Sequence, residues 1–427
     1  MTNIVLTEDQ AQALQRLRGF ESGFFLLEGG AGTGKTTLIQ EYARSITGGA
    51  WGYGEVAFTA PTNKAVRVLE ESAANAGMHV DCMTIYALLG LVLMPTGNVR
   101  PIQHIGAVTV DYGTVVIDEC SMIGDVLWGH INAQAHRFGK IIFMGDVHQL
   151  PPVNEEKSKA FSVPDRVSIK TIVRQQDGHP IVKLGADIRA FLDGGAAYSI
   201  GKHPTSIHHM APNKFKREMV EAFKHSAGDP SYVKVMAWRN STVDEYNAHI
   251  RNAIYGRTVT PFVVGETATP RAPIVQEDED ERGFVLPGKK RIHTDATVRV
   301  NEIWPAKHPV YRGINVWVMD VTDISTGVNM TVYFPADDGF ADEADRRKQE
   351  AKKIRQLWPA YYSFVESFAD LAHTYACTVH RAQGSTYTHA FVDVMDINLM
   401  RGPIRDQCLY VACSRPRKNL VVNGDVC

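Results

Sequence analysis

The sequence has little of several features that define specialised classes of protein. No apolar run reaches the roughly 18–20 residues that a membrane-spanning helix needs, so no membrane partner is expected. Six cysteines in 427 residues are sparse and form no Cys-x-x-Cys pair, which argues against a zinc cluster or a disulfide scaffold. The opening residues, MTNIVLTEDQAQ, lack the basic start and apolar stretch of a signal peptide. We therefore expect a soluble, cytoplasmic protein.

An excess of charge of one sign is also missing. Lys and Arg total 45 against 47 Asp and Glu, a net charge of −2, which excludes a globally basic nucleic-acid binder. A local basic groove stays possible, because the field in a cleft depends on the arrangement of charges rather than on their sum. The length of 427 residues predicts two to four domains of ordinary globular composition.

The strongest local signal is the sequence GGAGTGKT at 29–36, which fits the P-loop pattern G-x-x-x-x-G-K-[ST]. An apolar run at 24–27 predicts a strand before it, and 37–46 predicts a helix after it. Backbone N–H groups of such a loop bind phosphates, Lys35 would reach the β- and γ-phosphates, and the Thr36 hydroxyl can ligate Mg²⁺. The predicted contacts to ATP here are Gly30, Ala31, Gly32, Thr33, Gly34, Lys35, Thr36 and Thr37.

Two further apolar runs end in polar residues. The run at 114–117 is followed by Asp118, which could hold Mg²⁺, and by Glu119, which could orient or deprotonate the attacking water. Taken alone, this pair would be a solvated turn. The run at 141–144 leads to GDVHQLPP, where Gln149 could sense the γ-phosphate from a neighbouring parallel strand. Strands that alternate with helical stretches predict an α/β fold with a parallel sheet.

An ordered series of motifs resembles the superfamily 1 helicases, and within them the Dda/RecD-like branch of superfamily 1B. That resemblance implies two RecA-like domains with ATP in the cleft between them. It also implies that Gln10 reads adenine, that Gly384 adjoins the nucleotide, and that Arg174 and Arg415 stabilise transition-state charge. The series comprises Gln10, the P-loop, 60–65 (APTNKA), 84–86 (TIY), 117–122 (IDECSM), 145–153 (GDVHQLPPV), 173–175 (VRQ), 375–385 (YACTVHRAQGS) and 409–415 (LYVACSR).

The same resemblance implies a track for single-stranded DNA. Hydroxyls and amides suit phosphates, and aromatic faces suit stacked bases. The chain departs from the family pattern at Asn63, where a histidine is expected. Tyr86 could be a stacking platform or a core residue, and Trp238 could face DNA or be half-buried. The candidate DNA contacts are Pro61, Thr62, Asn63, Lys64, Thr84, Tyr86, Trp238, Thr378 and His380.

Two insertions are predicted. Residues 91–112 contain two apolar arms around a turn at 95–98, which favours a β-hairpin. In the resembled family a pin that splits the duplex lies here, with Met94, Pro95 and Val99 as candidate wedges; a passive surface hairpin is the alternative. Alternating runs within 261–335 predict a small β-barrel, SH3-like by resemblance, in which the acidic stretch 276–282 is a solvated loop. Residues 337–372 switch to helical composition and predict a projection of two helices broken at Pro359.

The resulting domain prediction has four parts. Domain 1A covers 1–90 and 113–176, domain 1B covers 91–112, domain 2A covers 177–260 and 375–427, and domain 2B covers 261–374. The predicted activity is that of an ATP- and Mg²⁺-dependent DNA helicase that moves 5′→3′ on single-stranded DNA, the direction being implied by resemblance alone. An RNA helicase or a P-loop ATPase that remodels proteins are the alternatives.

The expected partners are single-stranded DNA and junctions between duplex and single strands, with a single-strand binding protein or replication machinery beside them. Because both halves of the ATP site lie in one chain, we expect a monomer. The family resemblance implies the cytoplasm of a bacterium or of a phage-infected host.

Overall fold

The computed structural model describes residues 6–49, 52, 54–92, 102–103, 110–171, 173, 179–226, 229, 231–279 and 285–424. The chain divides into two compact units, one made of 1–215, 236–240 and 378–427, the other of 216–235 and 241–377. This division differs from the four predicted domains, whose boundaries stay a prediction.

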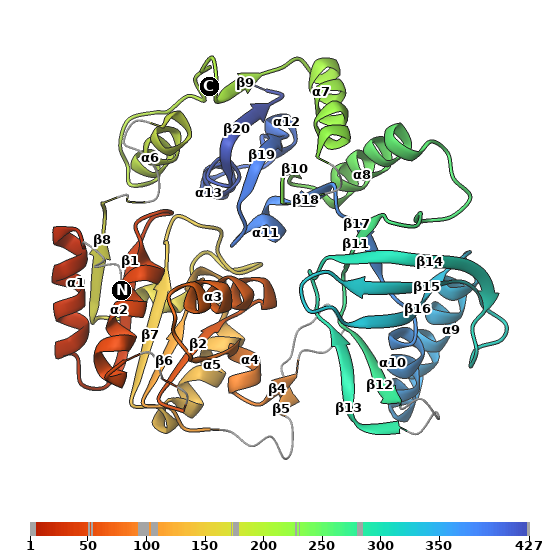
Figure 1. Cartoon of the computed structure of the whole chain (residues 1–427), viewed down its shortest axis with the longest axis horizontal. Coiled ribbons are helices and arrows are strands. Elements are labelled where there is room, and N and C mark those ends of the chain that lie inside the picture. Colours follow the sequence, from red (N-terminus) through yellow and green to blue (C-terminus); the bar gives the residue numbers. More distant parts are fainter. Residues whose placement is uncertain are drawn as a thin grey trace. The chain divides into compact units, whose positions relative to one another are not determined.

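The P-loop follows a central strand of a six-stranded sheet with the order β3-β2-β6-β7-β1-β8 (Figure 1). The strand pairs are parallel, which confirms the predicted α/β fold with a parallel sheet. Their carboxyl ends therefore meet at one edge, where ligands bind in such sheets. The strands are β1 (Gly23–Gly29), β2 (Val56–Ala60), β3 (Asp81–Thr84), β6 (Thr114–Ile117), β7 (Lys140–Gly145) and β8 (Arg166–Ile169).

Helices cover both faces of this sheet, so its strands carry apolar side chains on each side. Phe25 and Leu27 pack in one core with α1 (Glu8–Gly19), α2 (Lys35–Thr47) and α3 (Asn63–Asn75). Leu26 points into a second core with α4 (Ile85–Leu88) and α5 (Asp125–Gln134). Burial on both faces explains why the strands read as continuous hydrophobic runs. Short 3₁₀ turns lie at Cys120–Met122, Ala135–Arg137, Lys159–Ser162 and Arg355–Leu357.

A second sheet has the order β18-β10-β19-β20-β9. Strand β20 pairs in parallel with both β19 and β9. Its strands are β9 (Ile207–His209), β10 (Val233–Ala237), β18 (Ala376–Thr378), β19 (Tyr387–Val392) and β20 (Pro416–Val422). The helices that precede, connect or follow these strands in the sequence are α6 (Pro180–Leu192), α7 (Pro212–His225), α8 (Asn240–Tyr255), α11 (Val379–Ala382), α12 (Val394–Ile397) and α13 (Pro403–Cys413).

The larger predicted insertion is an antiparallel sheet of five strands with the order β16-β15-β14-β11-β17. Helices α9 (Gly339–Lys353) and α10 (Trp358–Glu366) follow it, and Pro359 lies in the first turn of α10, at the predicted break. The SH3-like closure of this sheet stays a prediction. The strands are β11 (Thr267–Pro270), β14 (Val298–Lys307), β15 (Asn315–Asp323), β16 (Asn329–Pro335) and β17 (Leu371–His373).

The structure bears on two further predictions, the solvated loop at 276–282 and the β-hairpin within 91–112. The prediction of a solvated loop at 276–282 is wrong for 276–279, which lie in β12 (Ile274–Glu279), paired antiparallel with β13 (Val285–Ile292). The register pairs Gln276 with Lys290 and Glu277 with Lys289. In the smaller insertion, β4 (Leu91–Val92) and β5 (Ile102–Gln103) pair antiparallel. The proposed wedges Met94, Pro95 and Val99 lie outside the described residues.

In the described part of the chain, no helix combines the length and the apolar character needed to span a membrane.

Candidate active site

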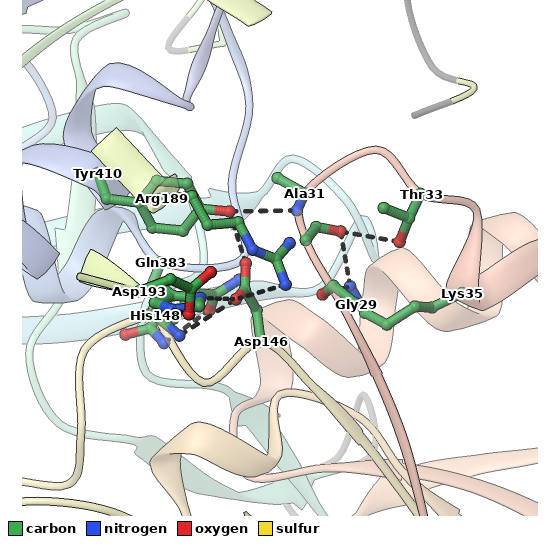
Figure 2. Close-up of polar contacts among 12 residues, drawn as sticks. Gly29, Ala31, Thr33, Lys35, Asp146, His148, Arg189, Asp193, Gln383 and Tyr410 are labelled. Atoms are coloured by element: carbon green, nitrogen blue, oxygen red, sulfur yellow. Dashed lines mark hydrogen bonds and ion pairs between the residues drawn. The ribbon is translucent and has the colours of Figure 1, made fainter. Parts of the chain in front are cut away.

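The loop between β1 and α2 has the backbone that phosphate binding requires. Gly32 and Gly34 adopt φ values of 80° and 78°, in the left-handed region that favours glycine. Gly34 caps α2, which begins at Lys35, so the helix N-terminus opens directly onto the loop. The Thr33 hydroxyl donates to Gly30 O at 3.0 Å and holds the loop curled. The strand, glycine-rich loop and helix predicted from GGAGTGKT are all present (Figure 2).

The ammonium group of Lys35 lies against its own loop. Its Nζ donates to Gly29 O at 2.7 Å and to Gly30 O at 3.0 Å (Figure 2). The positive charge is thereby placed at the start of the loop, on the side where the β- and γ-phosphates of a bound nucleotide would lie.

Two carboxylates follow β6, and both are half-buried. Loss of solvent raises the pKa of Asp118, although the charge of Lys35 opposes this. Loss of solvent and the neighbouring Asp118 charge raise the pKa of Glu119 to about 7, against the opposing charges of Arg415 and Lys35. A carboxylate with such a pKa is suited to accept a proton near neutral pH. Glu119 adopts a left-handed backbone with φ 51°, which costs a residue other than glycine roughly 1–2 kcal/mol.

Gln149 is joined to a distant motif by a buried amide network. The Nε2 of Gln383 donates to Gln149 Oε1 at 2.9 Å and to Ser121 Oγ at 3.0 Å. The next residue, Gly384, has φ 74°, and a Cβ on it would lie 3.5 Å from Glu119 Oε1. Residues from the IDECSM, GDVHQLPPV and VHRAQGS stretches therefore meet at one point.

A second network centres on Asp146, which was not predicted as a site residue. Its carboxylate is fully buried and accepts a hydrogen bond from the Tyr410 hydroxyl at 2.6 Å. The same hydroxyl accepts from the Ala31 N–H at 3.4 Å, so it bridges Asp146 and the P-loop (Figure 2). His148 Nδ1 lies 3.5 Å from Asp146 Oδ1, and its Nε2 lies 2.8 Å from Asp193 Oδ1.

The surroundings keep Asp146 ionised. Burial alone would raise its pKa, but His148, Arg189, Lys35 and the Tyr410 hydroxyl lower it to about 2. For His148 burial acts to lower the pKa, and the two neighbouring aspartates outweigh it and raise the pKa above its ordinary value.

Of the two arginines predicted to stabilise transition-state charge, the structure describes one. Arg174 lies outside the described residues. Arg415 is buried, and its guanidinium donates to Val411 O, Ser385 O and Ser414 Oγ at 3.0, 3.2 and 2.9 Å. Its charge acts on Glu119, but its hydrogen bonds go to Val411 and Ser414 near the end of α13 and to Ser385 after α11.

Gln10, the predicted adenine-reading residue, lies beside the P-loop. Its Nε2 donates to Thr33 O at 2.8 Å, and its Oε1 accepts from the Thr7 N–H at 3.0 Å in a capping box of α1. Each amide atom keeps a second hydrogen-bonding position, because an amide NH₂ has two protons and its oxygen two lone pairs.

Three of the predicted track hydroxyls serve as helix caps. Thr62 Oγ1 accepts from the Ala65 N–H, Thr84 Oγ1 from the Ala87 N–H, and Thr378 Oγ1 from the Arg381 N–H. Such caps fix the strand-to-helix turns. Thr62 closely follows β2, which lies next to β6, and Thr84 ends β3, which lies next to β2; Thr378 ends β18, at the edge of the second sheet.

The other predicted DNA contacts are partly exposed apart from Pro61, which is buried. Tyr86 is half-buried and packs against the core under α4 and α5, so its ring serves the fold at least in part. Lys64 lies over the Tyr387 ring at 5.9 Å, and burial lowers the pKa of His380. Asn63 begins α3.

The turn after β10 is held by a single buried carboxylate. Asp396 accepts from the backbone N–H groups of Trp238 and Arg239 at 2.7 and 2.9 Å, and from Arg239 Nε at 2.6 Å. Trp238 is half-buried, and Arg239 is exposed.

A pocket of about 800 Å³ adjoins the P-loop. Gly30–Gly32, Arg189, Tyr410 and Arg415 line it, together with the face of α6 that carries Gly185 and Ala186. Sequence reasoning missed Asp146, Tyr410 and Arg189. The first two stand inside quoted motifs, at positions with no distinctive residue type, and Arg189 stands in an ordinary amphipathic helix.

Two family models match the chain. A model described as an AAA domain matches residues 5–195, and a model described as a UvrD-like helicase C-terminal domain matches residues 373–422. The first includes the P-loop and the carboxylates after β6, and the second includes Gln383, Tyr410 and Arg415.

Curated proteins with similar sequences include DNA helicases. The chain is 22% identical over 428 residues to the ATP-dependent DNA helicase dda of Enterobacteria phage T4, covering 92% of each. It is 27% identical over 292 residues to the ATP-dependent RecD2 DNA helicase of Deinococcus radiodurans, covering 66% of this chain and 37% of that one. A solved structure of Pif1 helicases at forked double-stranded DNA is similar in fold, with a TM-score of 0.52, 15% identity, and 99% and 93% of the two chains covered.

Proposed function

We propose that this chain, which belongs to the superfamily 1B helicases and is an ATP-hydrolysing DNA helicase, moves 5′→3′ along single-stranded DNA and opens the duplex ahead of it. The observation that carries the coupling is the hydrogen bonding of Gln383 to Gln149 and Ser121, which joins motifs 234 and 262 residues apart in the sequence at one site.

Hydrolysis at this site would use groups that the structure brings together. Lys35 and the N–H groups at the start of α2 bind the phosphates, and Glu119 accepts the proton of the attacking water. Thr36 and Asp118 offer a hydroxyl and a carboxylate, the hard oxygen donors that fit Mg²⁺ when phosphates complete its shell. When bound, Mg²⁺ neutralises charge on the β- and γ-phosphates. Arg415 stabilises the charge of the transition state from the end of α13.

Coupling to DNA would run through α11. This helix is capped at its start by Thr378, a candidate track residue, and is followed directly by its C-cap Gln383, which donates a hydrogen bond to Gln149. A helix of one turn moves as a unit, because its backbone hydrogen bonds link its two ends. A change at the γ-phosphate that shifts Gln149 would therefore shift Thr378 and His380, and DNA contacts there would act back on the nucleotide site.

The remaining details of the proposal come from the family. A 5′→3′ direction, a DNA-splitting pin at 91–112, a monomeric motor, and a single-strand binding protein or replication machinery as partner fit a relative of Dda and RecD2. A cytoplasmic location in a bacterium or phage-infected cell fits the same relatives.

Unwinding of duplexes with either a 5′ or a 3′ single-stranded tail tests the direction. We expect ATP-dependent unwinding of the 5′-tailed duplex only. Unwinding of the 3′-tailed duplex alone would keep the motor and overturn the direction. RNA duplexes with matched tails, run in parallel, separate a DNA helicase from an RNA helicase, because phosphate and stacking contacts do not by themselves read the sugar.

A further inference from the structure

Arg189 places its guanidinium directly on the P-loop. A Cβ built on Gly30 would lie 1.9 Å from Arg189 Nη1, so the absence of a side chain at Gly30 makes room for this group. Arg189 comes from α6, lines the pocket beside the loop, and its side chain is only 21% exposed (Figure 2). Neither the P-loop pattern nor the predicted arginine fingers include it.

Arg189 makes no hydrogen bond through its guanidinium within the described part of the chain. A guanidinium has five N–H donors, and no acceptor for any of them is found among the described residues. Its one ion-pair partner there is Asp146, at 4.0 Å from Nη2 to Oδ1, beyond hydrogen-bond distance. Arg415, in contrast, already donates to three oxygens of its own surroundings. Arg189 therefore has donors to offer at the loop.

Asp146 and Tyr410 hold Arg189 in this place. The Tyr410 hydroxyl fixes Asp146 Oδ2 at 2.6 Å, and the His148 N–H donates to Asp146 Oδ1 at 3.1 Å. The ionised carboxylate then attracts the guanidinium to the loop without saturating its donors. This arrangement orients a cation and leaves it open to an anion.

The end of the loop that Arg189 covers is the end for the γ-phosphate. Lys35 Nζ lies 3.0 Å from Gly30 O, and a P-loop lysine reaches the β- and γ-phosphates. Gly30 therefore marks the outer end of the phosphate chain, away from the α2 N-terminus. We propose that Arg189 is a third arginine of the ATP site, which donates to the γ-phosphate and makes the site prefer nucleoside triphosphates over diphosphates, with Asp146 and Tyr410 as its positioning residues.

Equilibrium binding of AMP-PNP and of ADP, each with Mg²⁺ and without DNA, tests this inference. For Arg189→Ala we expect affinity for AMP-PNP to fall by about tenfold or more and affinity for ADP by less than about twofold, because only AMP-PNP has a γ-phosphate to lose a charge-assisted bond. Arg189→Lys should fall between, since lysine keeps the charge but not the fork. Lys183→Ala, which removes an exposed cation from the same helix, is the matched control.

A second variant, Gly30→Ala, tests the same contact if Arg189→Ala fails to fold. Gly30→Ala puts a methyl group 1.9 Å from Nη1, so the guanidinium must move away. This variant should reduce the preference for AMP-PNP as Arg189→Ala does, and the double variant should add less than about twofold. Equal losses for both nucleotides, or no loss for either, would overturn the proposal. The inference rests on the ATP site alone. A chain that discriminates as expected but fails to unwind DNA would contradict the proposed function and leave this inference standing.

Discussion

Two groups of strand-to-helix turns lie at the carboxyl ends of the strands in the P-loop sheet, and they differ in what their side chains bind. We call the turns after β1, β6 and β7 the nucleotide edge, with Lys35, Glu119 and Gln149, and those after β2 and β3 the track edge, with Thr62 and Thr84. The strand order β3-β2-β6-β7-β1-β8 keeps the two sets apart. At the nucleotide edge, side chains from distant motifs bind one another. At the track edge, hydroxyls cap their own helices.

This difference teaches what each edge must do. The nucleotide edge must place charges to within fractions of an ångström, so its groups are buried or half-buried and are linked by hydrogen bonds of Asp146, Tyr410 and Gln383. The track edge must let a polymer slide, so weak contacts from a rigid backbone suffice. Four predictions break or sharpen the comparison, in order of decreasing effect.

The largest expected effect is on ATP turnover, and it should distinguish a lysine of the nucleotide edge, Lys35, from a lysine of the track edge, Lys64. Lys35→Ala should lower ATP turnover by about 100- to 1000-fold, because it removes the cation at the β- and γ-phosphates, and should leave single-stranded DNA binding within a few-fold of wild type. Lys64→Ala should weaken DNA binding and leave turnover without DNA unchanged. Steady-state ATPase assays and fluorescence anisotropy measure the two. Full DNA-stimulated turnover of Lys35→Ala would contradict the assignment of the nucleotide edge.

The next effect concerns acid stability of the nucleotide edge. Asp146 has a folded pKa of about 2 against an ordinary value near 3.8, so its contribution is present above pH 4 and is lost as the pH falls towards 2. The loss amounts to about 2 kcal/mol. Urea unfolding at pH 6 and pH 3 should show a smaller drop for Asp146→Asn than for the wild type. An identical pH dependence of the two proteins would show that Asp146 is not held ionised.

A smaller effect is expected at Trp238. Its turn is fixed by Asp396, so the indole is presented in one place, and Trp238→Ala should weaken single-stranded DNA binding by about tenfold. Trp238→Phe keeps an aromatic face and should lose less than half of that effect. If Trp238→Ala binds DNA normally while its thermal stability falls, the ring belongs to the core and not to the track.

The smallest effect is expected at Thr62. Because its hydroxyl caps α3, Thr62→Ala should cost about 1 kcal/mol of stability and change DNA affinity by less than about threefold. Thr62→Ser keeps the hydroxyl and should behave as wild type in both measurements. A tenfold loss of DNA affinity at unchanged stability would show that the hydroxyl binds the track directly.

Much of the nucleotide edge could be predicted from the sequence, because the chemistry sits in contiguous residues. Gly29–Thr36 and the pair Asp118–Glu119 each carry the residue types that phosphate binding and water activation need, directly after an apolar strand. The parallel sheet followed from the alternation of strands and helices. The order of its strands did not, because sheet order depends on contacts that no local pattern records.

The rest of the site could not be predicted, because it is formed by contacts between residues that lie far apart in the sequence. Tyr410 and Asp146 are 264 residues apart in the sequence, and a tyrosine in a buried helix carries no local sign that its hydroxyl will meet a carboxylate. Arg189 was missed for the same reason. Thr62, Thr84 and Thr378 were assigned to DNA from their hydroxyls, and the capping role came from the helix that begins beside each one. The acidic stretch at 276–282 was taken for a loop because its basic partner strand could not be paired with it in advance.

The most direct test of the account is the rate of ATP hydrolysis by the wild-type chain with and without single-stranded DNA. If Gln383 and α11 link the track to the γ-phosphate, DNA should raise the turnover number by about tenfold or more, and Gln383→Ala should hydrolyse ATP slowly whether or not DNA is present. A wild-type rate that no nucleic acid changes would contradict the coupling of the two edges and leave only an ATPase.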